Sequence, residues 1–114
     1  MGVRRVDLLH GTLDLLVLKT LSVEPNHGYG IAMRIHQLSD ESLKVEEGSL
    51  YPALYRMEEQ GLIESEWRPT ENNRTAKFYR LTRKGRTAVQ AELQSWLRLS
   101  GGITRVLRAL EGGA

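Results

Sequence analysis

The sequence predicts a mainly α-helical fold with one small β-hairpin, an α+β class. Three segments with apolar residues at helical spacing come first, two alternating segments follow them, and a long helical segment ends the chain. With 114 residues, the chain is long enough for one hydrophobic core and too short for two ordinary domains. Hydrophobic residues make up 40% of it and charged residues 26%, which is typical of a folded chain.

The first helical segment is dense in leucine. It begins near Thr12, a residue suited to an N-cap, and ends before Pro25. Because its leucines occupy more than one side, we expect this helix to be buried among the others. After a turn at Pro25, Asn26 and Gly28, apolar residues repeat at helical spacing as far as Leu38 and predict a second helix.

A third helix is predicted at Ser49–Gln60, where Gly61 ends it. A polar connector precedes it, with a short strand expected at Leu43–Glu46. The apolar residues of this helix form one stripe, which consists of Leu50, Ala53, Leu54 and Met57. The opposite face of the helix is therefore not required for packing in the hydrophobic core.

Residues 62–68 and 76–81 alternate as strands do, and residues 69–74 between them contain the turn formers of a hairpin. Thr82 is placed to cap a final helix, in which apolar residues recur every three or four positions. The pair Gly101-Gly102 interrupts this pattern and costs about 1 kcal/mol per glycine relative to alanine. We expect a kink or an end there, unless packing against another helix compensates.

Three helices followed by a hairpin and a helix are the order of a winged helix-turn-helix at residues 1–82 with a C-terminal helix at 83–114. The second helix of the helix-turn-helix motif, which is the third helix of this chain, lies in the major groove of DNA, and the wing can reach neighbouring phosphates. Residues 68–86 contain seven basic residues and one acidic residue, whereas residues 24–66 contain three basic and nine acidic residues. Because the basic cluster falls on the wing, double-stranded DNA is the expected partner.

The third helix and the hairpin turn supply the candidate DNA contacts. Ser49 lies near a helix start and suits a phosphate, whereas Arg56 suits a bidentate contact with guanine. The full predicted set is Ser49, Tyr51, Pro52, Tyr55 and Arg56 in the helix, with Asn73, Arg74 and Lys77 in the wing. Packing in the core beneath the wing is the alternative for the two tyrosines, and ordinary solvation is the alternative for the wing residues.

Short motifs occur in a fixed order along nearly the whole chain. They are Gly11-Thr12-Leu13, His27-Gly28-Tyr29-Gly30, the run Gly48 to Leu54, Gly61-Leu62-Ile63, Lys77-Phe78-Tyr79, and Tyr79-Arg80-Leu81-Thr82 with Gly85. In this order and spacing they resemble the PadR-like family of bacterial transcriptional regulators. The resemblance implies a homodimer, a palindromic operator and usually repression. Because one helix follows the wing, the chain resembles the short subgroup of that family.

The same resemblance implies that the final helix at 83–114 is a dimerisation helix, assisted by the first helix. The expected interface residues are Leu13, Leu16, Leu93, Trp96, Leu97, Ile103 and Leu107. Some relatives bind flat aromatic effectors between the two dimer helices, so the resemblance makes Trp96 a candidate for stacking on such a ligand. The alternative for Trp96 is an anchor in the core or in the dimer interface.

Enzyme activity is not expected. The chain has no cysteine, and its three histidines (His10, His27 and His36) lack the helical spacing of metal ligands. No phosphate loop, nucleophile elbow or Ser-His-Asp arrangement can be assembled from the sequence, so we expect neither a cofactor nor a metal.

No apolar run approaches the ~20 residues of a membrane span, so we expect a cytoplasmic protein. The competing hypothesis for its function is a winged helix that does not bind DNA and docks an acidic protein through its basic hairpin. The acidic middle of the chain favours that alternative, because carboxylates near DNA would lower affinity. A steep loss of duplex binding with salt would separate the two hypotheses.

Overall fold

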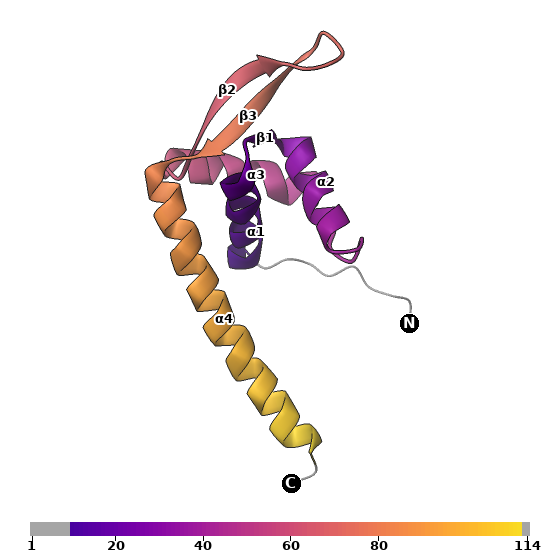
Figure 1. Ribbon diagram of the computed structural model, residues 1–114, viewed down its shortest axis with the longest axis vertical. Helices are drawn as coiled ribbons and strands as arrows, with labels where there is room; N and C mark the ends of the chain where they lie inside the picture. Colours follow the sequence, from indigo (N-terminus) through magenta and orange to yellow (C-terminus); the bar gives the residue numbers. More distant parts are fainter. Residues whose placement is uncertain (1–9, 113–114) are drawn as a thin grey trace.

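The computed structural model describes residues 10–112, so the two ends of the predicted units 1–82 and 83–114 lie outside the described part. The described elements are α1 (His10–Val23), β1 (Asn26–His27), α2 (Gly28–Leu38), α3 (Glu47–Glu59), β2 (Ile63–Pro69), β3 (Thr75–Leu81) and α4 (Arg83–Glu111). Helices and a small antiparallel sheet thus form the predicted α+β fold of a winged helix-turn-helix with one further helix (Figure 1).

Side-chain caps begin two of the helices. The N–H of Gly30 donates to Nδ1 of His27 at 3.0 Å, which caps α2. The N–H of Gly85 donates to the Thr82 hydroxyl at 3.0 Å, as predicted for the final helix. The same hydroxyl lies 2.6 Å from the carbonyl oxygen of Gly61, to which it donates. Thr82 therefore joins the start of α4 to the turn that follows α3.

The third strand of the sheet is not where the sequence predicted it. Residues Leu43–Glu46 form no strand, and β1 pairs with β3 instead, with Asn26 opposite Tyr79. The strand order is β1-β3-β2, so β3 is central and both of its edges are paired. This pairing satisfies backbone groups that β3 would otherwise leave open. A two-residue strand has no periodicity of its own, so only the tertiary pairing reveals it.

Helix boundaries also differ from the prediction. Helix α1 begins at His10, ahead of the expected cap Thr12, and α3 begins at Glu47, two residues before Ser49. A carboxylate in the first turn is favoured by the helix dipole, which explains the earlier start of α3. Helix α4 passes through Gly101-Gly102 without a break. Its 29 residues make it about 43 Å long.

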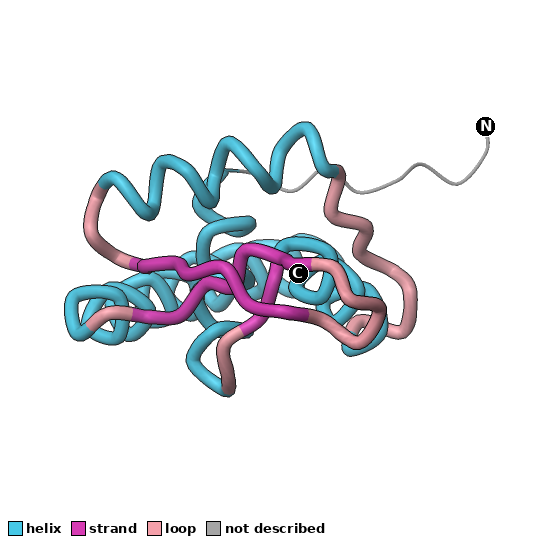
Figure 2. Tube along the Cα trace, turned by 90° about the horizontal axis from the view of Figure 1, so that it is seen from above, coloured by secondary structure: helices cyan, strands magenta, loops and turns pink. Residues whose placement is uncertain are grey.

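The hairpin of β2 and β3 projects from the helices as a wing (Figure 1). Its register runs from Ile63 opposite Leu81 at the base to Pro69 opposite Thr75 near the tip. At the tip, Asn73 has φ +57°, a left-handed conformation that asparagine tolerates well. Figure 2 looks down on the molecule and shows the strands crossing its middle with helices on both sides.

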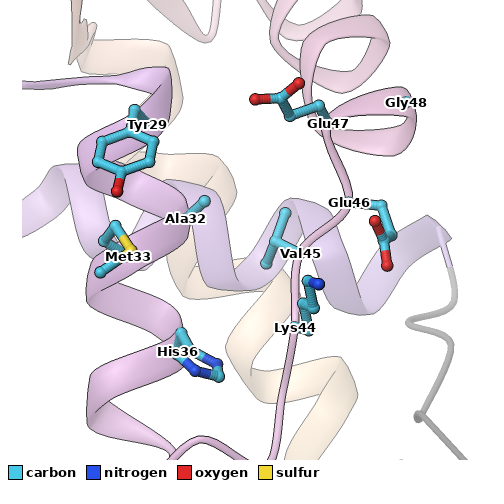
Figure 3. A pocket seen from close by; sticks show the side chains of 9 residues that line it. All are labelled: Tyr29, Ala32, Met33, His36, Lys44, Val45, Glu46, Glu47 and Gly48. Atoms are coloured by element: carbon cyan, nitrogen blue, oxygen red, sulfur yellow. The ribbon is translucent and has the colours of Figure 1, made fainter.

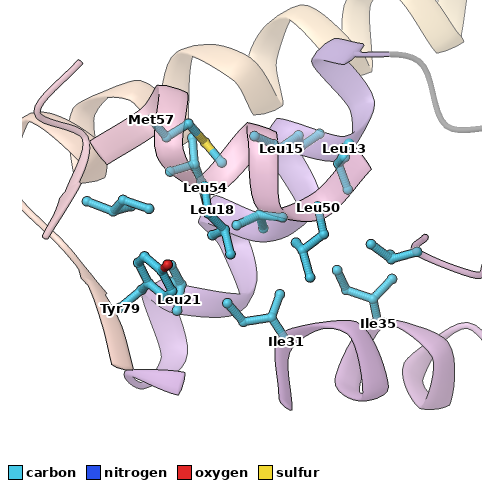
Figure 4. Packing of buried hydrophobic residues seen from close by; sticks show 14 of the residues in the cluster. Leu13, Leu15, Leu18, Leu21, Ile31, Ile35, Leu50, Leu54, Met57 and Tyr79 are labelled. Atoms are coloured by element: carbon cyan, nitrogen blue, oxygen red, sulfur yellow. The ribbon is translucent and has the colours of Figure 1, made fainter. Parts of the chain in front are cut away.

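The core is formed mainly by α1, α2, α3 and the base of the wing (Figure 4). Its fully buried larger side chains are Val17, Leu18, Ile31, Leu50, Leu54, Met57 and Ile63. The first helix contributes five buried residues, namely Leu13, Leu15, Val17, Leu18 and Leu21, which fits the predicted burial on more than one side. None of the helices in the described part of the chain is long and apolar enough to cross a membrane.

Candidate DNA-binding interface

One face of α3 is exposed, as its apolar stripe predicted. Ser49, Pro52 and Tyr55 lie three residues apart on this face, and the side chain of Tyr55 is 56% exposed. The opposite stripe of Leu50, Ala53, Leu54 and Met57 is buried. We call Ser49, Pro52 and Tyr55 the outer face of α3. The structure therefore brings three of the five predicted helix residues together on a surface that a DNA groove can reach.

Ser49 has less to offer a phosphate than its place in the sequence indicated. Its backbone N–H donates to the carbonyl oxygen of Glu46 at 3.0 Å, because the helix begins before it. The hydroxyl of Ser49 is thus the group that remains for a phosphate contact. Glu46 and Glu47 stand at the helix start, so this end of α3 does not favour a bound anion.

The two tyrosines of α3 differ in their surroundings. Tyr51 is half-buried and packs against the core, as the alternative for it required. Its phenol ring lies within 2.9 Å of the position that a Cβ on Gly28 would occupy. Glycine at 28 therefore allows Tyr51 to lie across the start of α2. Tyr55, by contrast, is exposed on the outer face.

Arg56 points to α1 and not to solvent. Its guanidinium donates two hydrogen bonds to the carboxylate of Asp14, Nη1 to Oδ2 and Nη2 to Oδ1, each at 2.8 Å. The side chains of Arg56 and Asp14 are 30% and 15% exposed. The hydrogen bond to Asp14 raises the pKa of the guanidinium further. Arg56 is therefore an internal contact between α3 and α1, not the outward-facing side chain that a guanine contact requires.

Replacing Arg56 by alanine should lower the free energy of unfolding by about 1–3 kcal/mol, because a half-buried carboxylate loses the two hydrogen bonds that the guanidinium donates. Urea unfolding of Arg56→Ala, Asp14→Ala and the double variant measures this. The double variant should lose less than the sum of the single losses. Unchanged stability of Arg56→Ala, together with weaker DNA binding, would contradict this role.

The predicted wing contacts divide into two places. Asn73 and Arg74 are exposed at the tip, where the carbonyl oxygen of Arg74 accepts bonds from the N–H and the hydroxyl of Thr70. Within residues 10–112 the guanidinium of Arg74 makes no ion pair. Hydrogen bonds therefore fix the backbone at the tip, and the guanidinium of Arg74 is available to contact a phosphate.

Lys77 lies partway along the wing, opposite Trp67, and contacts α3. Its Nζ is 3.5 Å from Oε1 of Glu58 and 5.7 Å from the ring centres of both Tyr55 and Tyr79. The hydroxyl of Ser65 donates to the other oxygen of Glu58 at 2.6 Å. Lys77 thus joins the wing to α3, and Glu58 balances its charge.

Other cations of the basic segment also have partners. Arg68 contacts Glu66 at 2.8 Å, and Arg80 contacts Glu64 at 2.8 Å and Glu66 at 3.2 Å. Arg68 also holds the pKa of Glu66 below its ordinary value. Glutamates of the wing therefore neutralise part of the positive charge that the sequence indicated for residues 68–86.

At the start of α4, Lys84 donates to the carbonyl oxygen of Gln60 at 2.8 Å, where the helix dipole of α3 favours a cation. This contact joins the start of α4 to the end of α3 and explains the cation at position 84.

Sequence reasoning missed Trp67, whose side chain is 67% exposed on β2 directly opposite Lys77. Because side chains alternate along a strand, Trp67 lies on the same side as Ile63 and Ser65. Ile63 is buried and Ser65 contacts α3, so this side of the wing faces α3. The alternation of side chains along the strand, starting from the buried Ile63, would have placed Trp67 on this side.

A pocket of about 580 Å³ lies between α2 and the segment that leads into α3. Figure 3 shows Tyr29 and Met33 of α2 on one side and Glu47 on the other. Its lining residues are Tyr29, Ala32, Met33, His36, Lys44, Val45, Glu46, Glu47 and Gly48. Because two of these are glutamates, the pocket does not suit a phosphate.

The predicted dimer residues fall into two groups. Leu13 is 5% exposed in the core of its own chain, so its assignment to a dimer surface is corrected. Leu16 and Leu93 are half-buried against the same core. Trp96, Leu97, Ile103 and Leu107 are exposed on α4. Trp96 also lines a shallow cavity of about 210 Å³ against the start of α1.

Tyr79 provides a test of the packing beneath the wing. Burial is the main cause that raises its pKa to about 12, and the charge of Glu58 adds to this. Since the folded pKa lies above the ordinary value of about 10, the stabilisation is complete below pH 10 and is lost as pH rises toward 12. Urea unfolding at pH 8 and pH 11 should show a fall that is smaller in Tyr79→Phe. An equal fall in both proteins would contradict the burial.

Within the described residues no group of three or more His, Cys, Asp or Glu side chains is placed to hold a metal ion. His27 is the cap of α2, and Nδ1 of His36 lies 3.0 Å from the carbonyl oxygen of Leu43. Both histidines therefore have roles in the local structure.

The sequence and the structure were compared with those of known proteins. The sequence profile of the PadR-like family of transcriptional regulators matches residues 17–91. A PadR family transcriptional regulator from Eggerthella lenta is 35% identical, has a TM-score of 0.70, and the match covers 85% of this chain and 82% of the other. A PadR-like transcriptional regulator from Bacillus cereus is 30% identical, with a TM-score of 0.72 and coverage of 85% and 92%. An uncharacterized protein X from Lysinibacillus sphaericus is 25% identical over 94% of this chain and 98% of its own length.

The profile match includes the second half of α1, the whole of α2 and α3, the wing and the first residues of α4. It therefore spans the outer face of α3 and the wing tip together. Proteins of this family regulate transcription and are not enzymes, in agreement with the sequence prediction. The chain belongs to the PadR-like family of transcriptional regulators.

Proposed function

We propose that this protein is a homodimeric repressor that binds a palindromic operator in double-stranded DNA. The observation that carries the proposal is one exposed helix face and one exposed cationic tip, joined by a rigid hairpin. Each strand of the hairpin has seven residues and spans about 23 Å, so the tip can contact DNA well beyond the groove that α3 enters. Such a regulator acts in the cytoplasm, where bacterial DNA lies.

The two parts of the interface have different tasks in this proposal. The outer face of α3, with Ser49, Pro52 and Tyr55, enters the major groove and reads bases. Asn73 and Arg74 at the wing tip contact the backbone or the minor groove and set the register. Lys77 and Tyr51 hold the wing and α2 against α3 and thereby position that helix.

A dimer is favoured by the exposed apolar residues of α4. Trp96, Leu97, Leu99, Ile103, Val106, Leu107 and Leu110 are all exposed, and they recur at helical spacing over four turns. A second copy of the chain is the partner that we propose for this apolar stripe. Two-fold symmetry of such a dimer then implies an inverted repeat in the operator.

Trp96 is also the residue through which we propose that an effector acts. Its indole lines the cavity against α1 and offers a flat face to an aromatic ligand. Quenching of Trp96 fluorescence by a compound that also changes operator affinity would support this. A compound that quenches without changing affinity would contradict it.

The test of the proposed function is selection of duplexes from a random DNA pool by the purified protein at moderate salt. Enrichment of an inverted repeat bound by two chains supports the proposal. No enrichment, with no duplex binding at any salt, contradicts it and favours the protein-docking alternative.

Titration of the enriched duplex then separates the two tasks. Arg74→Ala should weaken binding to all sequences and reduce the slope of log affinity against log salt by about one. Tyr55→Ala should leave that slope unchanged and alter the preference among related sequences. Equal losses on every sequence for both variants would contradict the division of tasks.

A further inference from the structure

We propose that the α3-facing side of the wing is itself a DNA contact, in which Trp67 packs against the sugars of the duplex backbone. We call Tyr55, Trp67 and Lys77 the junction surface, because they lie where α3 meets the wing. This inference rests on the proposed function and extends it from the wing tip to a site midway between the tip and α3.

Alternation along the strands separates the two sides of the wing. Ile63, Ser65 and Trp67 lie on the side that faces α3, together with Tyr79 and Lys77 of β3. The contact of Lys77 with Tyr55 joins this side to the outer face of α3. Trp67 stands opposite Lys77, where cross-strand Cβ atoms are about 5 Å apart. The exposed indole is therefore continuous with the proposed recognition surface.

The charges of the wing favour a polyanion on this side. Glu64 and Glu66 alternate to the other side, where they pair with Arg68 and Arg80. From Trp67 outward, the strand residues on the α3-facing side are Trp67, Pro69, Thr75 and Lys77, and none of them is acidic. Glu58 of α3 contacts this side of the wing, and Lys77 and Ser65 engage its carboxylate. A phosphate can therefore approach this side without meeting an uncompensated carboxylate.

An exposed tryptophan is the unusual element of this surface. Its side chain is 67% exposed, and the described part of the chain leaves it uncovered. A flat apolar ring can cover a deoxyribose while the neighbouring ammonium and hydroxyl groups contact phosphate. A second copy is the less favoured occupant, because α4, with the proposed dimer surface, extends away from the wing (Figure 1).

The experiment measures duplex affinity by fluorescence anisotropy, using the duplex enriched in the selection. Trp67→Ala should weaken binding about tenfold, as expected for loss of an aromatic anchor. The slope against salt should stay unchanged, because tryptophan carries no charge. Trp67→Phe should recover most of the affinity, and circular dichroism should show that both variants fold. The matched control is Leu38→Ala, which removes a side chain of 68% exposure at the far end of α2 and should bind normally.

A second measurement uses Trp96→Phe, in which Trp67 is the one remaining tryptophan of the chain. Its emission should change on addition of the unlabelled duplex. The inference is overturned if the native chain binds the duplex, Trp67→Ala binds it equally well, and the emission of Trp96→Phe does not change. The proposed function then remains intact. A shift of the monomer–dimer equilibrium by Trp67→Ala at constant duplex affinity also overturns it, in favour of a contact between copies. Failure of the native chain to bind any duplex overturns the proposed function, and this inference with it.

Discussion

Replacing Ile103 and Leu107 by glutamate should give a folded monomer that binds the operator about a hundredfold more weakly than the native chain, or worse. The two side chains are 50% and 53% exposed, and neither belongs to the core of its own chain. The substitutions therefore leave the protomer intact. In a dimer they would bury two carboxylates per chain in an apolar contact, which is costly. A monomer loses the gain that comes from binding two linked half-sites at once.

Sedimentation equilibrium and operator titration measure the two parts of this prediction. The matched control is Arg105→Glu, which changes the net charge by the same −2 as the two glutamates together. Arg105 lies on the opposite side of α4 from the apolar stripe, so this variant should stay dimeric. A double variant that remains a dimer, or a monomer that keeps native affinity, would show that α4 does not hold the regulator together.

The order of elements could be predicted from the sequence because its signals are local. Thr82 caps α4 through the N–H of a residue three positions later, and the apolar stripe of α3 repeats within one helix. By contrast, β1 at Asn26–His27 exists because β3 lies beside it, more than 50 positions later in the chain. Such a pairing leaves no pattern in a two-residue segment.

The site could be predicted in part for the same reason. Periodicity identified an exposed face of α3, but it also assigned Arg56 to that face. What decides its direction is Asp14, a partner 42 positions away on another helix. Leu13 was misassigned because leucines occupy several sides of α1, so their spacing does not reveal which of them the core of the same chain buries. Trp67 could have been found by alternation, since Ile63 fixes which side of the strand faces α3.

Helix α4 carries the proposed dimer surface, and its position relative to the wing depends on one glycine. Gly85 is buried in the first turn of α4, where its N–H donates to Thr82. A Cβ at this position would overlap the carbonyl oxygen of Leu62 and lie 3.1 Å from a methyl group of Leu81. The carbonyl of Leu62 also accepts the N–H of Thr82, the residue that caps α4. The backbone at Leu62 therefore cannot move aside without disrupting the Thr82 cap of α4.

Gly85→Ala should therefore lower the free energy of unfolding by about 3 kcal/mol, the upper end of what overpacking costs. The matched control within the same helix is Gly101→Ala, whose Cβ would meet only the Arg105 guanidinium at 3.7 Å. That substitution should stabilise the helix by up to about 1 kcal/mol, because alanine has the higher helix propensity. Thermal and urea unfolding of the two variants compare them directly. If Gly85→Ala is as stable as the native chain, the close approach of α4 to the base of the wing is wrong. If Gly101→Ala instead weakens the dimer, a partner helix packs closely against that glycine.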